Sequence, residues 1–117
     1  MAAFNNRTVV KVDASEMGGK GYFLRERFAE GEEYLTKNVT NFARITVLPG
    51  SELGRHQHVG DFEFYYFLEG EGEYDDNGTI VKVKPGDVYR CADGEWHCVR
   101  NTGDTDLVFI ALIIVSE

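Results

Sequence analysis

The sequence predicts an all-β domain, built as a sandwich or a barrel. Short runs rich in Val, Ile, Tyr, Phe and Thr alternate with turn residues along most of the chain. Both prolines precede a glycine, in Pro49-Gly50 and Pro85-Gly86, and each pair is typical of a turn between strands. Helical patterns are weak, because only Ala29–Leu35 is faintly helical and Gly31 interrupts it.

The expected strands follow one another at the close intervals typical of all-β folds. In chain order they are Thr8–Val12, Tyr22–Phe28, Asn41–Leu48, Glu63–Glu69, Gly72–Asp75, Thr79–Val83, Asp87–Cys91, His97–Asn101 and Leu107–Val115. Lys11–Lys20 is expected as the connection after the first strand. Asp76-Asn77-Gly78 predicts a hairpin, because Asn-Gly tolerates the positive φ angles of a type I′ turn. Gly103-Asp104 predicts a further turn.

The length of 117 residues predicts one domain, residues 1–117. It divides into an N-terminal strand region (1–40), a central region (50–101) and a C-terminal strand (107–115). That last strand is apolar throughout, whereas a strand with one face in water alternates. We therefore expect both of its faces to be covered, the outer one by a second subunit in a homodimer.

The charge balance argues against nucleic acid and anionic membranes as partners. The formal net charge is -8, with twenty acidic and twelve basic residues, and those partners require a cationic surface. Met1–Thr8 lacks the apolar core of a signal peptide, so we expect a cytoplasmic protein. The two cysteines, Cys91 and Cys98, are then expected to be free thiols with a packing role.

The three histidines of the chain lie at spacings that suit a metal site. His56 and His58 are two residues apart, and on a strand such residues point to the same face. Glu63 follows after a gap long enough for a bend, and His97 follows a turn further along. Imidazoles and a carboxylate suit Mn, Fe, Co, Ni, Cu or Zn. Taken alone, the His-x-His pair is weak evidence, and packed polar histidines are the alternative.

The spacing around these residues resembles the cupin superfamily. Its first motif is G-x5-H-x-H-x4-E-x6-G, and Gly50, His56, His58, Glu63 and Gly70 fill every defined position. Its second motif is G-x5-P-x-G-x2-H-x3-N, which is matched except at the proline. The matching residues there are Gly86, Gly94, His97 and Asn101, with Ala92 in place of the proline.

The resemblance implies a double-stranded β-helix, or jelly-roll barrel, with one divalent transition-metal ion inside. It implies that His56, His58, Glu63 and His97 hold that ion. Ala92 puts the rigidity of its turn in doubt, because a proline would fix the backbone there.

Alternation along the Glu63–Glu69 strand places Tyr65 and Phe67 on the face of Glu63, with Phe64 and Tyr66 opposite. Tyr65 is the candidate for a ligand contact or a catalytic role, against the alternative of core packing. Arg55 and Arg90 are candidates for binding a substrate carboxylate, although solvated surface positions are favoured for both. The acidic series is expected as a solvated rim, and it comprises Glu69, Glu71, Glu73, Asp75 and Asp76.

Two functions stay open at this point. The first is a metal-dependent enzyme of dioxygenase, decarboxylase or isomerase type, acting on a small oxygen-rich metabolite that chelates the ion. In that case Glu63 is a candidate base. The second is a binding module that holds a small carboxylate or sugar at the metal without turnover. The fold alone does not choose between them, because function depends on the site.

Overall fold

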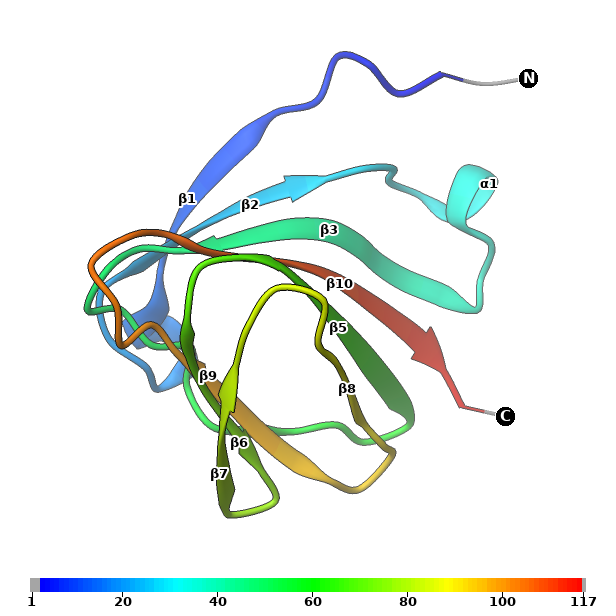
Figure 1. Cartoon of the computed structure of the whole chain (residues 1–117). Coiled ribbons are helices and arrows are strands. Elements are labelled where there is room, and N and C mark those ends of the chain that lie inside the picture. Colours follow the sequence, from blue (N-terminus) through cyan, green and yellow to red (C-terminus); the bar gives the residue numbers. More distant parts are fainter. Residues whose placement is uncertain (1–2, 117) are drawn as a thin grey trace.

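The computed structural model describes residues 3–116 and consists of two antiparallel β-sheets that form a jelly-roll. The larger sheet has the strand order β1-β2-β3-β10-β5-β8, and the smaller has the order β4-β9-β6-β7. In Figure 1 the strands β1, β2, β3 and β10 run side by side as one curved layer. The strands are β1 (Val9–Asp13), β2 (Tyr22–Arg27), β3 (Val39–Val47), β4 (His56–Gln57), β5 (Asp61–Glu69), β6 (Gly72–Asp76), β7 (Thr79–Val83), β8 (Val88–Cys91), β9 (Trp96–Arg100) and β10 (Leu107–Val115).

Each expected strand is present, with ends shifted by at most two residues. The two-residue strand β4 was not among the expected ones. The α-helix α1 spans Glu32–Leu35 and is shorter than expected, because Gly31 precedes it with a φ of 85°. The connection expected at Lys11–Lys20 holds the end of β1 and a 3₁₀ turn at Ala14–Met17. The predicted domain ends, residues 1 and 117, lie outside the described residues.

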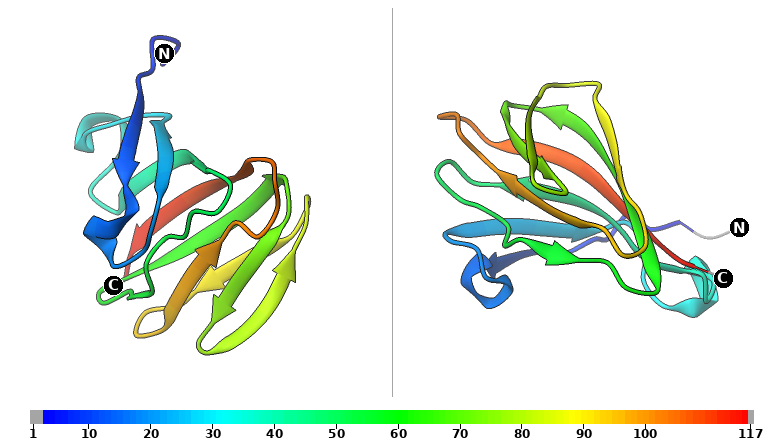
Figure 2. Two further views of the ribbon diagram at one scale, coloured as in Figure 1. Left: turned by 90° about the vertical axis from the view of Figure 1, so that its left-hand side faces the viewer. Right: turned by 90° about the horizontal axis from the view of Figure 1, so that it is seen from below.

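The core lies between the two sheets, which Figure 2 shows from two sides. Alternation along β5 and β10 directs Phe67 and Phe109 inward, where both are fully buried. Their rings lie 5.2 Å apart between centroids. From the smaller sheet, the buried Tyr74 of β6 and Val99 of β9 belong to the same cluster. Two packed sheets of alternating strands thus provide an enclosed interior in which polar side chains can be held.

Two motif residues, Asn101 and Gly70, fix the connection between β9 and β10. The buried Asn101 side chain donates to the carbonyl oxygens of Val47 and Thr105 at 2.9 and 2.8 Å. It also accepts the Gly103 amide at 2.9 Å. Gly70 has a φ of 83°, and a Cβ there would lie 2.2 Å from the Asp106 carbonyl oxygen. These two motif positions are therefore explained by turn structure.

The hairpin expected at Asp76-Asn77-Gly78 is present between β6 and β7. Asn77 and Gly78 both have positive φ angles, 51° and 95°, as a type I′ turn requires. Within residues 3–116, no helix combines the length and apolar character needed to cross a bilayer.

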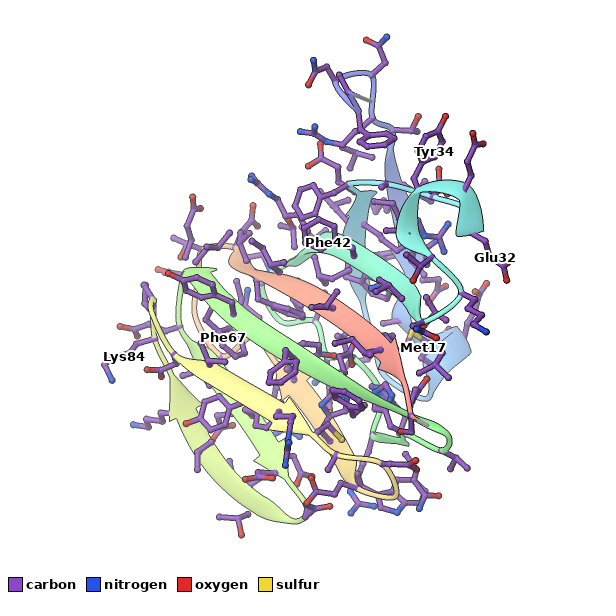
Figure 3. All side chains as sticks on the ribbon, turned by 90° about the vertical axis from the view of Figure 1, so that its right-hand side faces the viewer. Met17, Glu32, Tyr34, Phe42, Phe67 and Lys84 are labelled. Carbon is purple, nitrogen blue, oxygen red and sulfur yellow. The ribbon has the colours of Figure 1, made fainter. Side chains whose placement is uncertain are left out.

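The outer face of the larger sheet carries an apolar patch. Leu112 of β10 pairs with Phe42 of β3 and Phe64 of β5, and Tyr66 pairs with Val88 of β8. Phe42, Tyr66 and Val88 are 37%, 49% and 58% exposed, and Figure 3 labels Phe42 on β3. The chain itself therefore covers the outer face of β10 only in part.

Candidate metal centre

Four side chains from three strands meet at one point inside the jelly-roll. His56 lies on β4 and His58 directly follows it, Glu63 lies on β5, and His97 lies on β9. His56 pairs with His97 across the β4–β9 ladder. His58, Glu63 and His97 are buried, and His56 is partly exposed. The structure thus brings together all four residues that the motifs singled out.

The donor atoms face one another closely. Nε2 of His97 lies 2.9 Å from Nε2 of His56 and 3.1 Å from Nε2 of His58. Oε1 of Glu63 lies 3.0 Å from Nε2 of His58 and 3.1 Å from Nε2 of His97. All four donor atoms lie within 4.8 Å of one another.

The Nδ1 atoms of His56 and His58 form hydrogen bonds outside the cluster, and these fix the tautomers of both rings. Nδ1 of His56 donates to the Gly54 carbonyl oxygen at 2.8 Å, and Nδ1 of His58 donates to the Asp61 carboxylate at 2.7 Å. Both partners only accept, so both Nδ1 atoms carry the hydrogen. Nδ1 of His97 lies 2.9 Å from the Tyr74 hydroxyl. In their neutral forms His56 and His58 therefore direct their Nε2 lone pairs inward, as metal ligation requires.

Gly54 places the first of these partners. A Cβ at this position would lie 1.7 Å from the Met17 carbonyl oxygen. Only a glycine allows the 3₁₀ turn of Ala14–Met17 to approach the segment so closely. The Gly54 carbonyl oxygen that receives His56 is held at this contact.

The donor set fits a metal ion. Two inward lone pairs and a carboxylate at about 3 Å repel one another unless a proton or a cation lies between them. With bonds of about 2.1 Å, adjacent donors of an octahedral ion lie about 3.0 Å apart, whereas tetrahedral donors lie about 3.4 Å apart. Four of the donor pairs lie 2.9 to 3.1 Å apart, close enough for their atoms to bind one ion together. The cluster could therefore hold an ion with positions left for a ligand.

Electrostatics in the cluster agree with a charged carboxylate. Burial acts to raise the pKa of Glu63, but the hydrogen bonds from His58 and His97 outweigh it, and the pKa is lowered. The hydrogen bond to Glu63 raises the pKa of His58. Burial lowers the pKa of His56, which favours its neutral form.

A cavity of about 330 Å³ opens onto the cluster and includes His56, His58 and Glu63 in its wall. Tyr65 also lines it, and its ring stacks on His97 with centroids 4.9 Å apart. Burial and the nearby Glu63 charge keep the pKa of Tyr65 well above its usual value. Tyr65 is therefore a hydrogen-bond donor in this cavity and not a base.

Two arginines line the cavity from β2, a strand that lies outside both cupin motifs. Arg25 and Arg27 of β2 line it, while neither Arg55 nor Arg90 does. Arg55 pairs with Asp75 at 3.4 Å and lies over the Trp96 ring. Arg90 is exposed. The favoured surface position of Arg55 and Arg90 is thus what the structure shows. In the sequence, the one sign that this face points inward is the hydrophobic Phe23, which lies on the same face as Arg25 and Arg27.

The acidic series is less solvated than expected. Glu73 pairs with Arg100 at 3.4 Å, and Asp75 pairs with Arg55, so only part of the series is a free rim. Cys91 and Cys98 are buried free thiols, in agreement with their expected packing role.

The turn before His97 is held without the motif proline. The Ala92 amide donates to Oε1 of Glu95 at 2.7 Å, and a proline there has no hydrogen to donate. The Glu95 amide in turn donates to the Ala92 carbonyl oxygen at 3.0 Å. The rigidity that Ala92 put in doubt is thus provided by hydrogen bonds.

Fold and cluster together define a small jelly-roll protein with a buried three-histidine, one-carboxylate site. The Cupin domain model matches residues 43–114, and the chain belongs to the cupin family. The oxalate-binding protein of Thermotoga maritima is 45% identical over 98 residues, covering 84% of this chain and 80% of that protein.

Two further comparisons extend this picture. The crystal structure of a predicted oxalate decarboxylase from Thermotoga maritima has a TM-score of 0.90 at 40% identity, covering 99% of this chain and 100% of that one. The 5-nitrosalicylic acid 1,2-dioxygenase of Bradyrhizobium sp. is 33% identical over 64 residues, which are 55% of this chain but only 30% of that enzyme.

Proposed function

We propose that this cupin holds one divalent transition-metal ion at His56, His58, Glu63 and His97 and binds a small, oxygen-rich acid on it. The observation that carries the proposal is the convergence of four donor atoms beside an open cavity, whose wall includes His56, His58 and Glu63. A six-coordinate ion, such as Mn, Fe, Co or Ni, would keep open positions for that acid beside the four protein ligands.

The charge around the cavity supports an anionic ligand. Arg25 and Arg27 are both in its wall, and although Glu30 pairs with Arg27, Arg25 adds a positive charge there, whereas the carboxylate Glu63 is engaged by the histidines. With a divalent ion the cavity is strongly cationic in a chain of net charge -8. An acid that offers two adjacent oxygens, as oxalate does, would occupy the open positions of the ion. The name of the oxalate-binding relative supports the same ligand chemistry.

Turnover is the second candidate function, and the position of Tyr65 favours it. Tyr65 lies beside Glu63 in the cavity and keeps its proton, so it can donate a hydrogen bond to charge that develops on a bound acid. Glu63 is the candidate base, by leaving the ion. The ion would supply Lewis-acid activation. The dioxygenase and decarboxylase names of the relatives support this candidate.

Metal loading tests the proposal directly. Protein purified without a histidine tag and supplied with Mn²⁺ or Ni²⁺ should bind about one ion per chain, as elemental analysis would show. Glu63→Gln should lower the metal affinity at least tenfold (roughly, by loss of a charged ligand). Glu69→Gln, on the exposed end of the same strand, is the matched control and should load like the unchanged chain. Metal far below one ion per chain would refute the proposal.

Oxalate separates the two functions. Calorimetry should show that the loaded protein binds oxalate and that the metal-free protein does not. Consumption of oxalate with release of CO₂, or uptake of O₂, would establish turnover. Tight binding without either signal would establish the binding module.

We propose further that the apolar patch on the outer face of the larger sheet pairs two chains as a homodimer. Phe42, Tyr66 and Val88 are exposed there beside the half-buried outer side of β10, and exposed patches of this kind mark interfaces. Light scattering at micromolar concentration should give twice the 13.2 kDa chain mass. Tyr66→Asp should shift it to the single-chain mass, and a single-chain mass for the unchanged protein would refute the dimer. The cytoplasmic location and the absence of nucleic-acid and membrane partners stay predictions.

A further inference from the structure

The inner face of β2 turns from apolar to cationic along its length. Phe23 is buried in the core, and Arg25 and Arg27 follow at two-residue intervals on the same face. All three side chains line the metal-site cavity. A second cavity of about 530 Å³, next to the N-terminal segment and α1, shares both arginines. The two guanidinium groups therefore lie where the metal-site cavity opens into further space.

The arginines lie across the sheet from the metal cluster. The strand pairings run from Arg27 to Ala43, then to Ala111 and on to Tyr65. Three strand spacings of about 4.8 Å put the backbones of Arg27 and Tyr65 about 14 Å apart along the curved sheet. The two residues between them are Ala43 and Ala111, whose small side chains rise little above the inner face of the sheet. An extended arginine side chain covers only part of that distance.

One of the two guanidinium groups lacks an anionic partner. Arg27 pairs with Glu30 at 3.1 Å. Among residues 3–116, no carboxylate lies within ion-pair distance of Arg25. Burial and the adjacent charge of Arg27 both lower the pKa of Arg25, although Glu30 partly offsets them. A partly buried cation next to a like charge is unfavourable unless an anion joins it.

The wall between the arginines and the cluster is mainly apolar, with Thr40 and Asn41 as its polar residues. The cavity wall there includes Ile45, Leu53 and Ile113. Its volume of about 330 Å³ falls within the range of roughly 300–1,000 Å³ that holds drug-sized ligands. Oxalate, with two carbons, is too short to contact both the ion and the arginines.

We propose, resting on the metal-binding function above, that the preferred ligand is a longer acid with two functional ends. One end chelates the ion through adjacent oxygens, an apolar body of several carbons lies against Ile45 and Ile113, and a second carboxylate pairs with Arg25. Arg27 supports the same anion from the neighbouring position on the strand. Arg25 is thus the residue that selects diacids over monoacids of equal length.

A matched pair of probes tests this. α-Ketoadipate and α-ketocaproate have the same number of carbons and the same chelating α-keto acid group, and they differ in the distal carboxylate. We expect the Mn²⁺-loaded protein to bind α-ketoadipate about tenfold more tightly than α-ketocaproate or oxalate, as calorimetry would show. Arg25→Gln should remove that preference while leaving α-ketocaproate affinity within about twofold. Arg44→Gln, on the outer face of β3, should leave the preference intact.

The outcomes separate this inference from the function on which it rests. Equal affinity for the two keto acids, or an unchanged preference in folded Arg25→Gln, would overturn the diacid inference while metal loading stands. Oxalate binding more tightly than α-ketoadipate would do the same. Failure to load Mn²⁺ would overturn both. Circular dichroism of the arginine variants shows whether each one is folded.

Discussion

His58 donates its Nδ1 hydrogen to the Asp61 carboxylate at 2.7 Å while its Nε2 lies 3.0 Å from Glu63. The ring is therefore oriented from both sides, by one acid outside the cluster and one inside it. A carboxylate behind a histidine fixes its tautomer and raises its basicity as a ligand. Asp61 starts β5, the strand that also carries Glu63, so one strand positions two parts of the site.

Asp61→Asn should lower the metal affinity by about tenfold, because an amide neither carries the charge nor forces the hydrogen onto Nδ1. Competition with a fluorescent chelator measures this. Asp104→Asn, on the exposed loop before β10, serves as the matched control. Equal affinity in the two variants would show that Asp61 does not orient His58.

Metal affinity should rise with pH. In the metal-free protein the hydrogen bond to Glu63 raises the pKa of His58 above 6.5, so a proton competes with the ion for Nε2. That proton stabilises the metal-free fold below pH 6.5, and the contribution is lost as pH rises through the folded pKa. We therefore expect Mn²⁺ affinity, measured by calorimetry, to increase between about pH 6 and pH 8. An affinity independent of pH over that interval would contradict the proton competition.

The thiols should be inert in the folded chain. Burial raises the pKa of Cys91 and of Cys98 to about 12. At about pH 8 the reactive thiolate is then roughly one part in ten thousand. Mass spectrometry after iodoacetamide treatment should find both unmodified in buffer and both modified in urea. Rapid modification in buffer would place at least one of them at the surface.

Asn101→Ala should destabilise the fold by about 3 kcal/mol, because it leaves two carbonyl groups and one amide without their partner. Urea denaturation should show a lower midpoint with an unchanged slope. Asn6→Ala, at an exposed position, should change stability by less than about 0.5 kcal/mol. A similarly small effect at Asn101 would mean that the β9–β10 connection is held by other contacts.

Strand positions were predictable from the sequence where a run was long enough to show its composition. Leu107–Val115 and Thr79–Val83 have the expected bounds. The strand β4 is only His56–Gln57, and two residues show no period from which a strand can be inferred. The true start of α1 depended on the backbone of Gly31, which composition does not specify.

The cluster was predictable because its spacing is encoded locally, in two motifs. The arginines were not, because Arg25 precedes the first motif by a whole strand and connection. Alternation shows that Arg25 and Arg27 share a face but not that this face points inward. Only the pairing of β2 with β3, and of β3 with β10, places them in the cavity. Long-range strand order is information that single-strand patterns lack.

The cluster joins both sheets, since β5 belongs to the larger one and β4 and β9 to the smaller. His97 comes late in the chain, close to the final strand. During synthesis on the ribosome, a growing chain therefore carries only three of the four donors until β9 has been made. An ion bound by all four donors can therefore be captured only after the last of these three strands has emerged.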